Sequence, residues 1–213
     1  MTTARLFVGT SGWSYSDWVG PLYPAGTAPG AYLAHYCREF GAVEIDSTFY
    51  RIPTTRMVDG WRAASPDGFR FDAAFRVDAL PVLAAFLAEL PPDLRYAVEI
   101  RHRGWLTEEF TRLLEVRRVA LVLPDLYYMP RLDRVTTDFA YIRLLGKRSA
   151  VPDDFSHVRI ERDRELALWA ERIRGYLAGG VTVFVFANNH YQGHGPATAR
   201  ALLSRVAAPA SSS

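Results

Sequence analysis

The chain has 213 residues, of which 49% are hydrophobic and 13% aromatic, enough to bury the core of a single domain. The net charge of +2 comes from interspersed acids and bases, so overall electrostatics does not demand a nucleic-acid partner. A lone cysteine, Cys37, excludes an internal disulfide, and Met1–Arg5 leads into an apolar strand without the pattern of a secretory signal. With no apolar run near the roughly 18 residues of a membrane span, we expect a cytoplasmic protein without a membrane partner.

Short runs rich in Val, Ile and Phe alternate with segments of helical periodicity, as in a parallel α/β sheet. The predicted strands cover residues 6–10, 42–47, 69–75, 96–101, 119–124, 139–144 and 181–187. The predicted helices cover residues 29–40, 55–64, 78–90, 107–117, 162–177 and 196–206. The last residues, 207–213, have nothing to bury and are expected to form a mobile tail.

Most of these strands end in charged or amide side chains. Glu44, Asp46, Glu99, Arg101, His102, Asp125, Arg143, Asn188, Asn189 and His190 all lie at or just beyond a predicted strand end. Parallel α/β folds bind ligands at the carboxyl ends of their strands. Because alternate residues of a strand share a face, Glu44 and Glu99 are predicted to point away from the helices. A carboxylate in such an interior is costly unless it is paired or useful.

Five segments, in chain order, carry a recognisable set of motifs. They are Val-Gly-Thr-Ser-Gly-Trp at 8–13, Val-Glu-Ile-Asp-Ser-Thr-Phe-Tyr-Arg-Ile-Pro at 43–53, Val-Glu-Ile-Arg-His-Arg-Gly-Trp at 98–105, Tyr-Ile-Arg-Leu at 141–144 and Phe-Ala-Asn-Asn-His at 186–190. This set resembles the YecE-like family, domain of unknown function family 72. The resemblance implies one TIM-like parallel β/α barrel domain over 6–206. It implies no activity, since the family's own is not established and a relation to TIM-barrel DNA-repair endonucleases has been suggested only by analogy.

The chain departs from the family pattern at three places. Ala74 stands where the family usually has lysine, and Leu145 stands where it usually has histidine. Residues 78–92 hold a single predicted helix where the family inserts an additional helix and strand. Seven strands are therefore predicted in place of eight, so the barrel is expected to be incomplete, distorted or closed by a partner.

The charged residues at the strand ends allow two interpretations. Glu99 could be a general base, with Asp46 or Glu44 as its electrostatic partner, while Arg101 and Arg143 clamp a phosphate or carboxylate. Alternatively, the arginines only neutralise a buried layer of carboxylates.

The remaining candidates are histidine, amide and aromatic side chains. His102 and His190 could transfer protons near neutral pH, and Asn188 and Asn189 offer hydrogen bonds to a sugar or base edge. Trp13 and Tyr50, with other aromatic residues after the strands, are candidates for stacking on a ligand. Asp125, His102 and His190 are also competent metal ligands. No local spacing supports a divalent metal, however, so no cofactor is identified.

The leading hypothesis is an enzyme-like barrel that binds an anionic, phosphate-bearing or sugar-like ligand and hydrolyses an ester or glycosidic bond. The alternatives are a catalytically inactive barrel that binds a ligand or nucleic acid, which Ala74 and Leu145 favour, and a scaffold subunit that forms a homo-oligomer at the missing strand.

Overall fold

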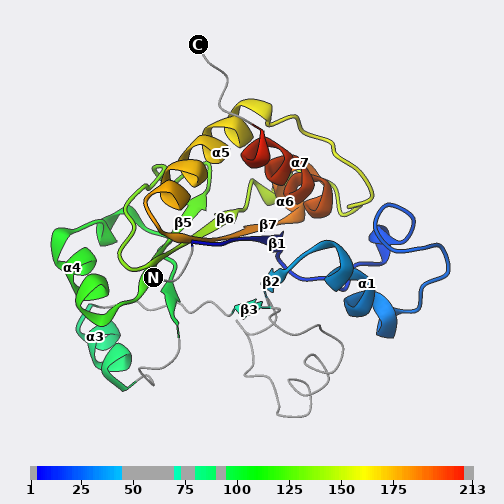
Figure 1. Cartoon of the computed structure of the whole chain (residues 1–213). Coiled ribbons are helices and arrows are strands. Elements are labelled where there is room, and N and C mark those ends of the chain that lie inside the picture. Colours follow the sequence, from blue (N-terminus) through cyan, green and yellow to red (C-terminus); the bar gives the residue numbers. More distant parts are fainter. Residues whose placement is uncertain (1–3, 45–69, 73–79, 90–94, 209–213) are drawn as a thin grey trace.

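The structure of the protein, a computed structural model, describes residues 4–44, 70–72, 80–89 and 95–208. Its main sheet is parallel and has the strand order β1-β7-β6-β5-β4. The strands are β1 Leu6–Thr10, β4 Ala97–Val98, β5 Ala120–Asp125, β6 Phe139–Leu144 and β7 Thr182–Ala187. A second parallel pair consists of β2 Ala42–Glu44 and β3 Arg70–Asp72 (Figure 1).

One bridge connects the strand pair to the main sheet. Ser11 forms a parallel bridge with Glu44, and the Gly12 backbone N–H donates to the Glu44 carbonyl oxygen at 2.8 Å. The prediction of a parallel α/β fold is confirmed. A closed barrel is not shown, because no described residue of β3 pairs with β4, which leaves the sheet open at this point.

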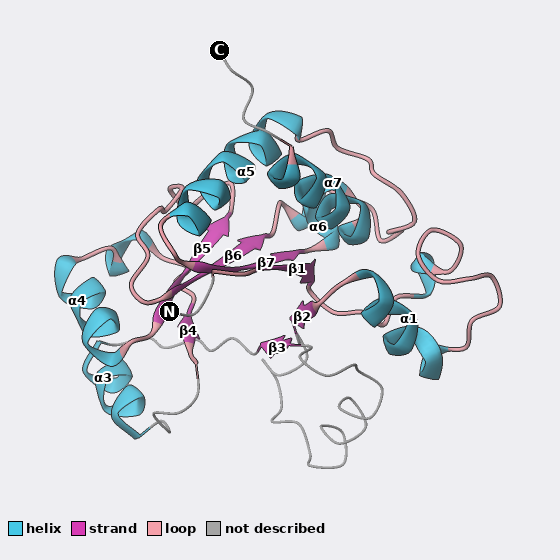
Figure 2. Cartoon of the chain, in the orientation of Figure 1, coloured by secondary structure: helices cyan, strands magenta, loops and turns pink. Residues whose placement is uncertain are grey.

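The helices are α1 Tyr32–Glu39, α3 Leu80–Glu89, α4 Glu108–Arg117, α5 Asp163–Ala178, α6 Asn189–Gln192 and α7 Gly195–Ala207. α5 and α7 lie side by side over one face of the main sheet, and α3 and α4 lie together near its β4 edge (Figure 1, Figure 2). No helix among these described segments has the length and apolar character needed to cross a membrane.

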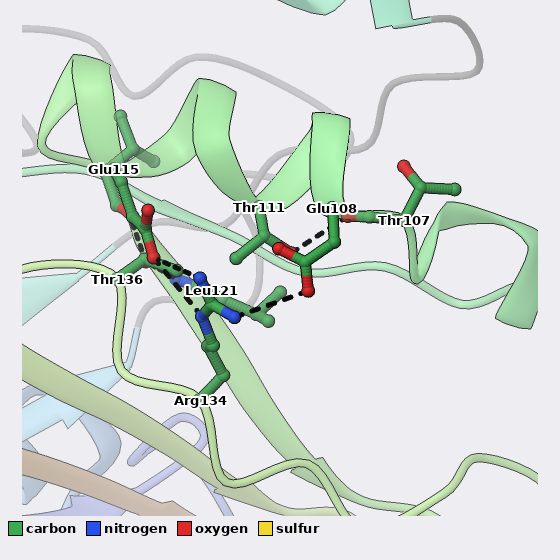
Figure 3. Close-up of polar contacts among 8 residues, drawn as sticks. Thr107, Glu108, Thr111, Glu115, Leu121, Arg134 and Thr136 are labelled. Atoms are coloured by element: carbon green, nitrogen blue, oxygen red, sulfur yellow. Dashed lines mark hydrogen bonds and ion pairs between the residues drawn. The ribbon is translucent and has the colours of Figure 1, made fainter.

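The predicted elements match the structure closely, with β4 shorter than expected. Helix α4 begins as its sequence indicates, because the Thr107 hydroxyl oxygen accepts from the Phe110 backbone N–H at 3.2 Å. On the exposed side of α4, Arg134 binds Glu115 at 2.8 Å and Glu108 at 3.5 Å (Figure 3). The short helix α6 was not predicted. The predicted strand residues 45–47, 69 and 73–75, among them Ala74, lie outside the described residues, as do the predicted helix 55–64, residues 78, 79 and 90 of the next predicted helix, and the tail residues 209–213.

The two faces of the sheet have different surroundings. On one face, Val8, Leu123, Ile142 and Val185 pack in a core that includes Trp169 of α5 and Leu202 of α7. On the other face, the sheet's own side chains pack together, among them Ala42, Val122, Phe139, Tyr141, Phe184 and Phe186. This second face carries the polar residues toward the carboxyl ends of the strands.

Candidate functional site

Glu44, at the end of β2, is fully buried and lies at the centre of a polar cluster. Its carboxylate accepts from the Ser11 hydroxyl at 2.5 Å and from the Tyr141 hydroxyl at 2.7 Å. It also pairs with Arg143, with Nε and Nη2 each 2.7 Å from a carboxylate oxygen. Glu44 therefore joins β1, β2 and β6 on the inner face, away from the helices as predicted.

Glu99, just after β4, extends this cluster toward the surface. One of its oxygens pairs with Nη1 of Arg143, and the other pairs with Nε of Arg101. The Glu99 side chain is buried, whereas 31% of the Arg101 side chain is exposed. The two acids and two arginines thus form one neutral cluster, with Arg101 at its exposed end.

Arg143 is held charged by its surroundings. Burial lowers the pKa of its guanidinium, but the charges of Glu44 and Glu99 outweigh burial and raise the pKa above its ordinary value. The side chain donates to both carboxylates in the forked geometry that suits arginine. In its described contacts, Arg143 therefore acts as an internal counter-ion for Glu44 and Glu99.

A pocket of about 350 Å³ lies beside the exposed end of the cluster. The lining residues are Arg101, Leu126, Tyr127, Tyr128, Gly146, Lys147, Arg148 and Ser149. Three of them are cations and none of those described is acidic, and we call this site the basic pocket. It lies just beyond β4, β5 and β6, at the carboxyl ends of these strands.

Lys147 and Arg148 set the charge of the basic pocket. Both are exposed, and neither forms an ion pair with an acid within the described part of the chain. Lys147 Nζ lies 5.4 Å from the centre of the Tyr127 ring. The Lys147 and Arg148 side chains can therefore form ion pairs with a bound anion.

The loop arginines hold the other wall of the basic pocket. Arg101 Nη1 donates to the Tyr128 hydroxyl at 3.3 Å, and Arg103 donates to the Tyr128 carbonyl oxygen from Nε at 3.2 Å and Nη2 at 3.1 Å. The Tyr127 and Tyr128 rings meet edge to face, with 5.0 Å between the ring centres. The loop after β5 is thus tied to the loop after β4.

The end of the β6 strand also fits tightly against α6. Gly146 has a φ of +67°, and a Cβ there would lie 2.2 Å from the His190 carbonyl oxygen. A side chain at this position would clash with backbone, which explains the glycine before Lys147.

Asp125 lies apart from the cluster, on the helix-facing side of β5. Its Oδ2 accepts from Trp169 Nε1 at 2.7 Å and from the Tyr191 hydroxyl at 2.8 Å. Both donors belong to fully buried residues of α5 and α6. The structure therefore gives Asp125 a packing role, in addition to any contact with a ligand.

Asn188 and Asn189 shape the turn after β7. Asn188 Oδ1 accepts from the His190 backbone N–H at 2.9 Å and caps α6. Asn189 Oδ1 accepts from the Gly195 backbone N–H at 2.9 Å, at the start of α7. Both side-chain amide oxygens therefore already accept hydrogen bonds from backbone N–H groups.

Four other predicted residues lie outside the cluster or outside the described chain. His102 is exposed, accepts from the Gly104 N–H at 3.0 Å and lines a different pocket with Trp105. Trp13 is half-buried and packs against the core. Asp46 and Tyr50 are not among the described residues.

His190 provides a reporter of charge near the basic pocket. Burial lowers the pKa of His190 below its ordinary value, Arg148 lowers it further, and Asp153 raises it. We predict that Arg148→Ala raises the pKa of His190, because a nearby positive charge is removed. An NMR pH titration of the histidine ring measures this directly. An unchanged His190 pKa in the variant would show that Arg148 does not act on it.

The residues that are chemically competent as metal ligands are not grouped around a common point in the part of the chain that is described. No group of three or more His, Cys, Asp or Glu side chains is arranged there to hold an ion. Leu145, where the resemblance leads one to expect histidine, is buried in a core cluster with Leu126 and Met129.

The family profile described as "Protein of unknown function DUF72" matches residues 7–76 and 71–212. The chain belongs to the DUF72 family. Among curated relatives, it is 26% identical to the UPF0759 protein YecE of Escherichia coli K12 over 56% of this chain and 59% of that protein. It is 33% identical to the UPF0759 protein YunF of Bacillus subtilis 168 over 49% of this chain and 54% of that protein. The aligned region thus spans little more than half of these relatives.

Two solved DUF72 structures resemble this fold. A protein from Thermotoga maritima MSB8 superposes with a TM-score of 0.67 and 23% identity, covering 94% of this chain and 97% of that one. A protein from Enterococcus faecalis V583 superposes with a TM-score of 0.73 and 16% identity, covering 97% and 99%. At these identities the similarity concerns the DUF72 fold alone.

Proposed function

We propose that this DUF72 protein binds a small phosphate-bearing anion in the basic pocket. The observation that carries the proposal is the presence of two exposed cations, Lys147 and Arg148, without acidic partners among the described residues, next to Arg101. Two cations close together, unneutralised, favour an anion between them. A volume of about 350 Å³ falls within the range of small-molecule sites.

The position in the fold supports the same proposal. We propose that the main sheet and the β2–β3 pair form the wall of an open, TIM-like barrel, because the Ser11–Glu44 bridge connects them. Barrels of this class carry their sites at the carboxyl ends of the strands, where the basic pocket lies.

Replacing both Lys147 and Arg148 with alanine is predicted to weaken binding of inorganic pyrophosphate at least tenfold. The physical reason is the loss of two positive charges from one pocket. Isothermal titration calorimetry at low and at 0.15 M salt measures the change, and binding should weaken as salt rises.

The matched control is Arg112→Ala with Arg117→Ala. Both arginines are exposed on α4, so this variant loses the same net charge without changing the basic pocket. Equal losses in the two double variants would mean that pyrophosphate responds to overall charge, and the proposed site would be rejected.

Hydrolysis of a phosphate ester is a second candidate, favoured by the position of Arg101. Arg101 pairs with Glu99 and also lines the basic pocket. An anion that attracts Arg101 would free one oxygen of Glu99 to act as general base. A water oxygen would then bond to phosphorus while the bond from phosphorus to the ester oxygen breaks. One water proton would pass to Glu99, which returns it to solvent, and the leaving alcohol oxygen would take a proton from solvent.

For this second candidate, Glu99→Gln is predicted to reduce turnover of bis(p-nitrophenyl) phosphate by about 100-fold or more. Glu108→Gln, an exposed substitution on α4, should leave turnover unchanged. Release of p-nitrophenol, followed by absorbance, measures both. Turnover by the Glu99 variant at the wild-type rate, or none by the wild type, would exclude this hydrolytic role.

A further inference from the structure

A second pocket adjoins the basic pocket and differs from it in charge. It has a volume of about 310 Å³, and its polar lining consists of Asp125, Tyr127, Arg131, Arg162 and Glu165. Carboxylates accept hydrogen bonds and guanidinium groups only donate them, so this pocket offers both kinds of partner. We call it the mixed pocket.

Tyr127 and Leu126 line both pockets. Tyr127 therefore lies where the two pockets meet, and 70% of the residue is exposed. Its ring lies nearly at right angles to the Tyr128 ring, with 5.0 Å between the ring centres, and 5.4 Å from Lys147 Nζ. A ring placed in this way can stack on a planar ligand with little loss of conformational freedom.

We infer that the ligand is a mononucleotide, with its phosphate in the basic pocket and its base on Tyr127 at the mixed pocket. The charges of the two pockets match the two ends of such a molecule. A phosphate needs cations, which Lys147 and Arg148 supply. The polar edge of a nucleobase needs both donors and acceptors, which Arg131 and Glu165 supply.

This inference rests on the proposed phosphate-binding function and extends it to the substrate class. Two fragments of a mononucleotide each lack one of the required parts. Ribose 5-phosphate has the anion but no planar ring, and adenosine has the ring but no anion. Only a molecule with both parts uses both pockets.

The test compares AMP, CMP, ribose 5-phosphate, adenosine and inorganic phosphate by isothermal titration calorimetry. AMP or CMP is expected to bind on the order of tenfold more tightly than ribose 5-phosphate, because stacking on an aromatic side chain adds to the phosphate contact. Tyr127→Leu should remove this advantage while leaving ribose 5-phosphate binding within about twofold. Tyr127→Phe, which keeps the ring, should retain the advantage.

The outcomes separate the two proposals. Equal binding of AMP and ribose 5-phosphate would overturn the mononucleotide inference and leave the phosphate site standing. Failure of AMP, CMP, ribose 5-phosphate and inorganic phosphate to bind would overturn both. Tighter binding of a single-stranded oligonucleotide than of AMP, falling steeply with salt, would replace the mononucleotide with a nucleic acid.

Discussion

Replacing Arg143 with leucine is expected to lower the free energy of unfolding by about 3–5 kcal/mol. Arg143 is almost fully buried and pairs with both Glu44 and Glu99. Without it, Glu44 keeps only the hydroxyls of Ser11 and Tyr141 as side-chain partners among the described residues. An unpaired buried carboxylate is the physical source of the loss.

Urea denaturation measures this loss, and Arg134→Leu serves as the control. Arg134 also binds two glutamates, Glu115 and Glu108, but on the exposed surface of α4 (Figure 3). Its removal should cost about 0–1 kcal/mol. Adding Glu44→Gln to the Arg143 variant should recover part of the stability, because one buried charge is removed. A loss for Arg143→Leu no larger than that of the control would contradict the view of Arg143 as an internal counter-ion.

Replacing Asp125 with alanine is the second large change, with an expected loss of about 2–4 kcal/mol. The substitution leaves the Trp169 indole N–H and the Tyr191 hydroxyl without the acceptor that both now share. These donors are fully buried, so water does not readily replace the carboxylate. Burial raises the pKa of the Tyr191 hydroxyl, and the charge of Asp125 raises it further, so this hydroxyl keeps its proton and remains a donor.

Asp138→Ala is the matched control for this experiment. Asp138 accepts a hydrogen bond from Arg95 at 2.9 Å, but both side chains are about half exposed. Its loss should therefore cost about 0–1 kcal/mol in urea denaturation. An Asp125 variant of full stability would contradict the packing role that its contacts indicate.

The sequence predicts the fold well where strand alternation is strong. Val43 and Ile142 pack toward the helices, whereas Glu44 and Arg143 face the interior, as period-two alternation requires. Of the predicted balanced cluster, Glu44, Glu99, Arg101 and Arg143 come together. Asp46 lies outside the described residues.

Other parts of the site needed the three-dimensional structure. Tyr141 shares its face with Arg143 in β6, and alternation alone could have identified it as a partner of Glu44. Asp125 follows the same rule on the opposite face, but its contacts with Trp169 and Tyr191 depend on how α5 and α6 pack. Periodicity does not determine that packing.

The basic pocket was missed for a different reason. Lys147 and Arg148 follow β6 directly after a glycine, which is a local signal for a loop at the strand end. The sequence does not show that their charges remain unneutralised, because this depends on which acids lie nearby. The sequence also does not show the place of Arg101 in the pocket wall. Its partner Glu99 is close in sequence, but its contact with Tyr128 connects two different loops.

Binding of a phosphate-bearing anion in the basic pocket can be observed directly. A crystal structure of the protein soaked in tungstate, a heavy analogue of phosphate, tests it most directly. We predict an anomalous peak within hydrogen-bond distance of the Lys147 and Arg148 side chains, and its absence from crystals of the variant with alanine at both positions. A peak only at other sites, or one that persists at this site in the variant, would contradict binding of the anion in this pocket.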